Sequence, residues 1–460
     1  MLKPKPWRAL LISACLILSA CDPSNNSEPT SVAQQLANKA LESNRAWEIL
    51  ESLTTEVGPR LAGTEADKRA VEWAQTMLME SGFDKVWLEP VAFPVWRRYT
   101  EYARVISPYP QELKITALGY SGSTDGEMIG DIVKFETLDE LNAASREQVL
   151  GKIVFINQSM ERNKFGTGYG ATVPIRSQGP VIAKQKGAKG VLIRSVGSDT
   201  HRLPHTGAST REEDPLPSAA LSVPDADQLV RILARSDKVT VGMDVQTTRY
   251  PNGQSYNVIG QINGRTKPDE ILLMGAHLDS WDLGTGALDD GAGVAIISAA
   301  AQLIGELPEK PARSIRVVLF ANEEAGVWGG RAYAEAHADE LALHIFASES
   351  DFGAGAVWQF DHAANNKNHQ QLMDKLTPVF KHLGIAAGEP ATTGGPDIGP
   401  MSQLGVPVMR LRQDGTGYFD YHHTANDTLD KVNPKTLKQN VAAWAALYYT
   451  VANSEHFFRE

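Results

Sequence analysis

The stretch ILLMGAHLDSWDLGTGALDDGAGVAIISAA, residues 271–300, decides the fold of this chain. It opens with an apolar run, passes through a loop rich in glycine and acids, and ends in an apolar, alanine-rich segment. We predict a buried strand over 270–274 and a helix over 291–304. A buried strand that is followed by an apolar helix is typical of a parallel sheet with helices on both faces.

The same alternation of strand and helix continues on both sides of this stretch. We predict further strands over 257–262, 314–321, 341–347 and 406–411, and further helices over 330–340, 370–383 and 433–451. The pattern predicts an α/β fold in which helices sandwich a mostly parallel, mixed sheet. Groups that bind ligands lie beyond the carboxyl ends of the strands in such sheets, so the chemistry is expected just after each strand.

The segment over 109–248 has a different character. Its helical periodicity is weak, and short apolar runs at 132–135, 153–156 and 191–193 predict strands. We interpret it as an inserted, β-rich domain. The chain then divides as follows: a signal segment over 1–21, a tether and the first part of the main domain over 22–108, the insert over 109–248, and the rest of the main domain over 249–460.

The first 21 residues predict export and lipid attachment. Three basic side chains precede an apolar run over 9–20, which is too short to span a membrane. The run ends in LSAC at 18–21, which resembles the lipobox of bacterial lipoproteins, where the cysteine is acylated. We expect an exported protein on the periplasmic side of the cell envelope, anchored through Cys21 and tethered by 22–31. An ordinary cleaved signal peptide is the alternative.

Composition excludes several classes of protein. The formal net charge of −11 argues against nucleic-acid binding, which normally needs a basic face. The two cysteines, Cys15 and Cys21, both lie near the start, which excludes a disulfide framework, a cysteine zinc site or a cysteine nucleophile in the body of the protein. No later apolar run is long enough to span a bilayer, so the lipid anchor is the expected membrane contact.

A histidine and two acids in the opening stretch are candidates for chemistry. His277 leaves the predicted strand, and Asp279 can accept the other ring N–H and fix the tautomer. Asp289 precedes glycines that allow a tight turn into the helix. A buried, unpaired carboxylate is costly, and a metal ion removes that cost. A structural hydrogen bond is the alternative for His277.

More candidates follow the later strands. Glu323 and Glu324 are adjacent, so one can bind a metal while the other acts as a base. Asp351 follows the next strand, and His422 and His423 lie in the loop after the last one. Nitrogen and oxygen donors without sulfur, following successive strands of one sheet, favour zinc in an open, catalytic site.

From about residue 57 to its end, the chain resembles the co-catalytic zinc exopeptidases. These include secreted bacterial aminopeptidases and glutamate carboxypeptidase, and the resemblance is strongest to their carboxypeptidase Q branch. The motifs that carry it are HLDSWD at 277–282, ALDDG at 287–291, NEE at 322–324, GPRL at 58–61 and the segment over 423–428. The insert resembles the protease-associated domain of some members, which would shape the mouth of the cleft.

The resemblance implies two zinc ions per chain and a role for each candidate residue. One zinc would be bound by His277 and Asp351, the other by Glu324 and His423, with Asp289 bridging them. Asp279 would orient His277, and Glu323 would be the general base that takes a proton from the water and gives it to the leaving amine.

Spacing within the family selects among adjacent residues. The bridging acid stands twelve residues after the histidine, which selects Asp289 over Asp290, and the second histidine stands four before Asp427, which selects His423. His422 occupies the position where many aminopeptidases of the family carry a tyrosine that stabilises the oxyanion. His422 either supplies that donor or has a structural role.

The expected substrate is a dipeptide or short peptide. The SWD stretch at 280–282 favours a carboxypeptidase Q-like dipeptidase, and an aminopeptidase is the alternative. Glutaminyl cyclases share the architecture with a single zinc, and some relatives have lost their metals and only bind ligands. The full ligand set with Glu323 argues against both. Relatives suggest a homodimer.

Overall fold

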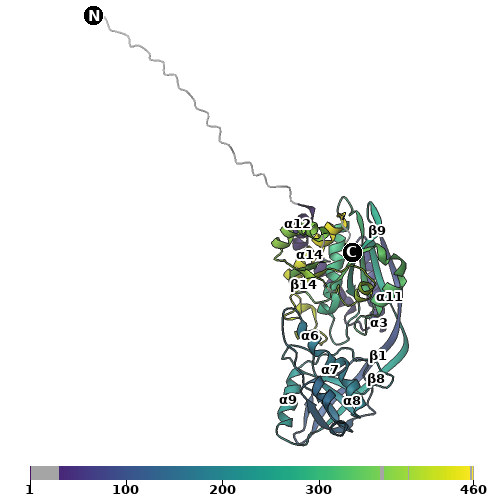
Figure 1. Ribbon diagram of the computed structural model, residues 1–460, viewed down its shortest axis with the longest axis vertical. Coiled ribbons are helices and arrows are strands. Elements are labelled where there is room, and N and C mark those ends of the chain that lie inside the picture. The colour runs from purple at the N-terminus through teal and green to yellow at the C-terminus, as the bar shows by residue number, and fades with distance from the viewer. Residues whose placement is uncertain (2–30, 363–366, 392, 456–457, 459–460) are drawn as a thin grey trace.

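The computed structural model describes residues 1, 31–362, 367–391, 393–455 and 458 of the chain (Figure 1). The predicted lipid anchor at Cys21, and nearly all of the signal segment and tether, lie outside these residues. In the described part, a large mixed sheet passes through the whole molecule, and helices cover it.

The main domain is built on five strands of this sheet. β9 (Lys267–His277) lies between β11 (His344–Glu349) and β10 (Arg313–Phe320) and is parallel to both. β10 then pairs antiparallel with β8 (Thr240–Ile262), and β8 with β1 (Lys85–Ser107). The predicted α/β class with a mixed sheet sandwiched by helices is confirmed.

Helices pack on both faces of these strands because alternate strand residues point to opposite sides. One face buries Leu272 and Val317 against α1 (Val32–Glu42), α2 (Arg45–Ser52), α3 (Glu65–Glu80), α10 (Ala292–Gly305) and α14 (Pro434–Ala452). The other face buries Leu273 and Val318 against α11 (Trp328–Ala336) and α13 (Gly399–Gln403). The predicted helices over 291–304 and 433–451 are therefore confirmed.

The helix α10 is apolar on all sides because it lies in the core. The segment Ala287–Gly305 is long and apolar enough to cross a membrane, but 94% of that window is buried inside the fold. Among the described residues it is the one candidate span. Its position between the sheet and α14 identifies it as a core helix.

The segment between β1 and β8 forms a second lobe. Both strands are 23 residues long and extend as a paired ribbon from the main domain into this lobe. The helices α6 (Thr167–Thr172), α7 (Pro174–Ser177), α8 (Gly179–Gln185) and α9 (Val223–Leu233) gather there (Figure 1). The lobe adds β2 (Gln111–Leu113), β3 (Ile115–Ala117), β4 (Met128–Phe135), β5 (Ile153–Ile156), β6 (Gly190–Arg194) and β7 (Ser218–Leu221). The predicted strands over 132–135, 153–156 and 191–193 are confirmed by β4, β5 and β6.

The lobe holds more helix than its β-rich prediction implied. Its helices are α4 (Leu138–Ala143), α5 (Arg146–Val149), α6 (Thr167–Thr172), α7 (Pro174–Ser177), α8 (Gly179–Gln185) and α9 (Val223–Leu233). Most are shorter than two turns, too short to show a helical period in the sequence. β4 to β7 run parallel, as strands joined by helices do.

A three-stranded sheet lies beside the main one and corrects one expectation. It consists of β13 (Ala386–Pro390), β12 (Val357–His362) and β14 (Arg410–Gln413), with α12 (Lys367–His382) between β12 and β13. The predicted strand over 406–411 was expected in the main sheet. Among the residues that the structure describes, one bridge, between Ala347 and Val408, joins it to the main sheet, and Pro407 offers no N–H for a continuous ladder.

Candidate metal centre

Three neighbouring parallel strands deliver the first candidate residues to one edge of the sheet. His277 is the last residue of β9, Asp351 follows β11, and Glu323 and Glu324 follow β10. Because these strands lie side by side, their carboxyl ends meet at one place. Asn322 has a φ of 55°, a left-handed conformation that asparagine tolerates and that turns the chain sharply out of β10.

Asp289 stands at the centre of the cluster. It lies in the irregular turn Ala287–Gly291 that leads into α10. One carboxylate oxygen, Oδ1, is 3.1 Å from Nε2 of His277, and the other, Oδ2, is 3.2 Å from Nε2 of His423. This carboxylate therefore links two histidines that are 146 positions apart in the sequence (423 − 277).

Each histidine also faces a second carboxylate. His277 Nε2 lies 3.7 Å from Asp351 Oδ1, and His423 Nε2 lies 2.9 Å from Glu324 Oε2. The structure thus brings all five residues that the sequence proposes as ligands into one continuous series: Asp351, His277, Asp289, His423 and Glu324. Four of them are buried, and Asp351 is largely so.

The cluster has the charge and the free donor atoms that divalent cations require. Asp289 Oδ2 and Glu324 Oε1 are buried without a hydrogen-bond partner in the described part of the chain. Burial, and then the neighbouring Asp289, raise the pKa of Glu324, because the charged form is poorly solvated and repelled. A cluster of buried carboxylates is stabilised by a cation, and imidazole nitrogen and carboxylate oxygen are donor atoms that suit zinc.

The structure separates the roles of the adjacent residues Asp289 and Asp290. The Asp290 carboxylate accepts main-chain N–H groups from His277, at 3.2 Å, and from Gly293, at 3.1 Å. It therefore supports the backbone on both sides of the turn, although it lies close to His277 and Asp351. Asp289 is the acid placed between the two histidines.

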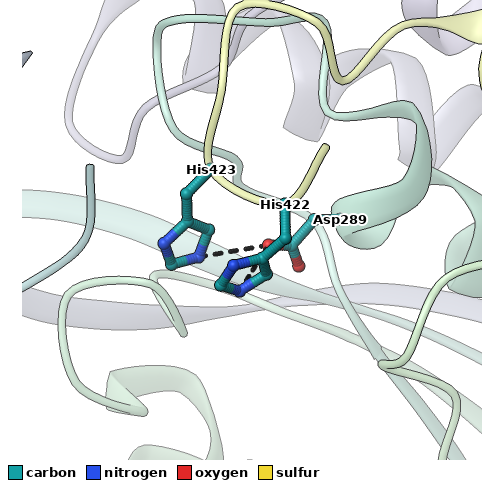
Figure 2. A group of neighbouring side chains, drawn as sticks. All are labelled: Asp289, His422 and His423. Carbon is teal, nitrogen blue, oxygen red and sulfur yellow. Dashed lines mark ion pairs between the residues drawn. The ribbon is translucent and has the colours of Figure 1, made fainter. Parts of the chain in front are cut away.

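The two adjacent histidines both reach Asp289 (Figure 2). Their rings stack with centroids 3.5 Å apart, and His422 Nε2 lies 3.5 Å from Asp289 Oδ2. His423 additionally contacts Glu324, whereas His422 packs against aromatic rings, among them Tyr418. Burial and the neighbouring His423 hold the pKa of His422 well below its usual value, so its ring is neutral.

Asp279 lies beside both His277 and Glu323. His277 Nδ1 is 3.0 Å from the main-chain oxygen of Asp279 and 3.6 Å from its carboxylate. The nearer acceptor is thus the main chain rather than the carboxylate that the sequence suggested. Asp279 Oδ1 instead accepts the main-chain N–H of Glu323 at 3.0 Å, and so holds the turn that carries the candidate base.

A cleft of about 630 Å³ opens over the cluster. Glu323 and Asp351 line it from the ends of β10 and β11, and burial raises the pKa of Glu323 well above its ordinary value. The small sheet contributes Arg410, and the lobe contributes Tyr169 and Arg176. The cleft therefore lies between the main domain and the lobe, and is large enough for a small ligand.

Two buried residues support the cluster in ways the sequence did not indicate. Asp427 accepts the main-chain N–H groups of Leu288, at 2.7 Å, and of Asp289, at 3.1 Å. Arg60 is fully buried and donates to main-chain oxygens at both ends of the loop between His277 and Asp289, those of Leu278, Thr285 and Gly286. In the sequence, Arg60 lies in the GPRL motif and Asp427 in the segment after His423, and these motifs were the signals that could have pointed to them.

A mixed sheet with buried imidazole and carboxylate groups gathered at its edge is typical of metal-dependent hydrolases. The family model of Peptidase family M28 matches residues 257–448. Carboxypeptidase Q of Mus musculus is 34% identical over 90% of this chain and 86% of its own length, and that of Homo sapiens is 34% identical over 92% and 89%. The chain belongs to peptidase family M28 and is a metallopeptidase.

Solved structures agree with this fold. The peptidase M28 precursor from Shewanella amazonensis is 50% identical, with a TM-score of 0.91 over 93% of this chain and 98% of its own. An aminopeptidase from Aneurinibacillus is 19% identical, with a TM-score of 0.65 over 93% of this chain and 98% of its own. The second likeness concerns the fold alone.

We expect Asp427→Asn to weaken zinc binding by about 10- to 100-fold, because an amide cannot accept both N–H groups that place Asp289. A titration of metal-free protein with zinc against a competing chelator measures this. Asp430→Asn, an exposed change in the same segment, is the matched control and should leave the affinity unchanged. Equal affinities in the two variants would contradict the supporting role of Asp427.

Proposed function

We propose that this protein is an exopeptidase that hydrolyses dipeptides or short peptides with two zinc ions, in the manner of carboxypeptidase Q. The observation that carries the proposal is the position of Asp289 between two histidines, each of which faces a further carboxylate, with Glu323 beside them in the cleft. The relatives with 34% identity over most of the chain are named carboxypeptidase Q.

The donor atoms suggest how two ions would be held. His277 and Asp351 would hold one zinc, Glu324 and His423 the other, and Asp289 would bridge them. When bound, a zinc pair lowers the pKa of a water molecule and stabilises negative charge on the peptide oxygen. Asp279 orients the turn that carries the base through the N–H of Glu323.

The protein's own groups would move the proton. Glu323 is the general base: its carboxylate takes a proton from the attacking water and then delivers it to the leaving amine. Burial raises its pKa, which suits a group that must both accept and release a proton. His422, neutral and at the cleft, has one ring N–H to donate to the developing oxyanion.

Glu323→Gln should lower kcat by about 10²- to 10⁴-fold, because an amide cannot accept the proton from water. The variant should still bind two zinc ions per chain, since Glu323 is not a ligand. Dipeptide hydrolysis and metal content by mass spectrometry test both statements. Glu335→Gln, an exposed change on α11, is the control and should leave both unchanged.

Three results would overturn parts of this scheme. Retained activity in Glu323→Gln would remove that residue as the base. One zinc per chain at saturation in the unchanged protein would favour a glutaminyl cyclase. Zinc binding with no hydrolysis of any peptide would favour a non-catalytic binding protein.

One basic side chain of the cleft, Arg410, favours substrates with a free carboxyl group. Arg410 lines the cleft, and burial lowers its pKa, as expected of a guanidinium removed from water. The nearby Asp361 carboxylate is paired with Arg412 instead. Within the described part of the chain, the Arg410 guanidinium forms no ion pair, so it remains available to a substrate carboxylate.

Arg410→Met should raise KM about 10- to 100-fold for dipeptides with a free carboxyl group, the value of one charge-assisted hydrogen bond. Dipeptides amidated at the C-terminus should be cleaved poorly by the unchanged protein and should not respond to the substitution. Arg265→Met, at an exposed ion pair, is the control. Rapid cleavage of amidated dipeptides, together with resistance of N-acetylated ones, would instead identify an aminopeptidase.

We also propose that the protein is exported and anchored to the membrane by lipid at Cys21, on the strength of the LSAC sequence. A homodimer is compatible with this arrangement and is part of the proposal. In bacterial cells, Cys21→Ser should shift the protein from the membrane to the soluble fraction of the envelope, and Cys15→Ser should not. An intact-mass measurement that finds no acyl group on the unchanged protein would refute the anchor.

A further inference from the structure

The inserted lobe contacts the metal cluster directly through a loop over residues 199–208. The main-chain oxygen of Thr206 lies 3.2 Å from Nδ1 of His423, and the N–H of Thr206 donates to the main-chain oxygen of His423 at 3.0 Å. Thr206 is fully buried. Both the ring and the backbone of a candidate zinc ligand are thus bound by a residue of the lobe.

The same loop holds the neighbouring histidine through a buried pair. His205 Nδ1 donates to the main-chain oxygen of His422 at 2.6 Å, and its Nε2 lies 2.5 Å from Asp199 Oδ2. The side chains of His205 and Asp199 are 0% and 1% exposed, so solvent does not compete for these bonds. Both ring nitrogens face oxygen atoms, so the ring is held between Asp199 and the main chain of His422.

The His205 ring has room because residue 197 is a glycine. A Cβ on Gly197 would lie 2.3 Å from the His205 ring, closer than any real contact allows. The Arg98 guanidinium fixes the loop from the main-domain side, because it pairs with Asp282 and lies 3.4 Å from Thr206 Oγ1. The loop is therefore held between the lobe and the HLDSWD motif.

His423 needs such support because its backbone is strained. Its φ of 62° is left-handed, which costs a residue with a side chain about 1–2 kcal/mol. It also follows a strand of the small sheet, so the main sheet does not position it as it positions His277. A hydrogen bond from Nδ1–H to the Thr206 oxygen fixes the tautomer that leaves Nε2 free toward Glu324 and Asp289.

We propose that Asp199, His205 and Thr206 of the lobe are positioning residues for one half of the metal centre, the half formed by Glu324 and His423. The lobe is then part of the metal site and not only a wall of the cleft. This inference rests on the proposed two-zinc function. It assigns the lobe a role for which the positions of Asp199 and His205 in the sequence gave no signal.

His205→Gln and Asp199→Asn test the proposal. Each should weaken the binding of one zinc ion by about 10- to 100-fold, the effect expected when a group that orients a ligand is lost, and leave the other zinc in place. Titration of the metal-free full-length protein with zinc, followed by metal counting, measures this. Hydrolysis by both variants should recover as zinc is added, because the ligands themselves remain.

His201→Gln is the matched control, since His201 lies in the same loop but is exposed. It should bind both zinc ions as the unchanged protein does. Gly197→Ala is a second variant that removes no polar group and only displaces the His205 ring. It should also lose one zinc, which separates the position of the ring from the loss of its hydrogen-bonding groups.

The outcomes distinguish this inference from the proposed function. Failure of the unchanged protein to bind two zinc ions would refute the two-zinc function itself. Two ions in the unchanged protein, with unchanged affinities in His205→Gln, Asp199→Asn and Gly197→Ala, would refute the positioning role alone. Loss of both ions together in a variant with native circular dichroism would also refute it, because the effect would not be confined to one half.

Discussion

The structure depends on one buried carboxylate, that of Asp289, which lies between two histidines from distant parts of the chain. Its two oxygens face His277 and His423 separately, so the geometry holds only if three segments are fixed independently. The sheet fixes the segment of His277 through β9, and the turn into α10 fixes Asp289. The segment of His423 is fixed by the lobe and by the packing of the neighbouring His422 against Tyr418. An error in any of these segments would leave a charged group buried without a partner, which is among the costliest faults in a protein.

The supporting groups around Asp289 follow from this cost. Asp427 binds the two N–H groups of the turn, and Asp290 binds N–H groups on both sides of it. Arg60 binds the oxygens of the loop, and nearby carboxylates, Asp427 first, oppose the effect of its own burial on its pKa. Two acidic side chains and one arginine that do not line the cleft thus provide hydrogen-bond partners for the main chain of the turn and the loop. The carboxylate oxygens of Asp289 and Glu324 remain directed at the cluster.

Much of this could be predicted from the sequence, because the information is local. His277, Glu323 and Asp351 each follow a run of buried residues, and adjacent parallel strands necessarily bring their ends together. The position of His423 is a different case. It was expected after a strand of the same sheet, but β14 belongs to the small sheet. The loop that carries it is held by residues of the lobe that lie more than 200 positions earlier in the sequence. No periodicity or motif records a contact between Asp199, His205 and a loop that follows so much later. Within the lobe, β4, β5 and β6 could be predicted from their apolar runs, whereas most of the helices are shorter than two turns and too short to show a helical period.

The position of the lobe connects substrate size with metal binding. The paired strands β1 and β8 bring the lobe over the ends of β9, β10 and β11, so that Tyr169 and Arg176 close one side of a cleft of about 630 Å³. Arg176 also donates to the main-chain oxygen of Thr206, at 3.2 Å, so the wall of the cleft and the support of His423 share one side chain. A lobe that moved away to admit a long polypeptide would also withdraw the carbonyl that orients His423. The fold therefore favours short peptides for a physical reason: the lobe that limits the length of the cleft also holds His423, which we propose as a zinc ligand.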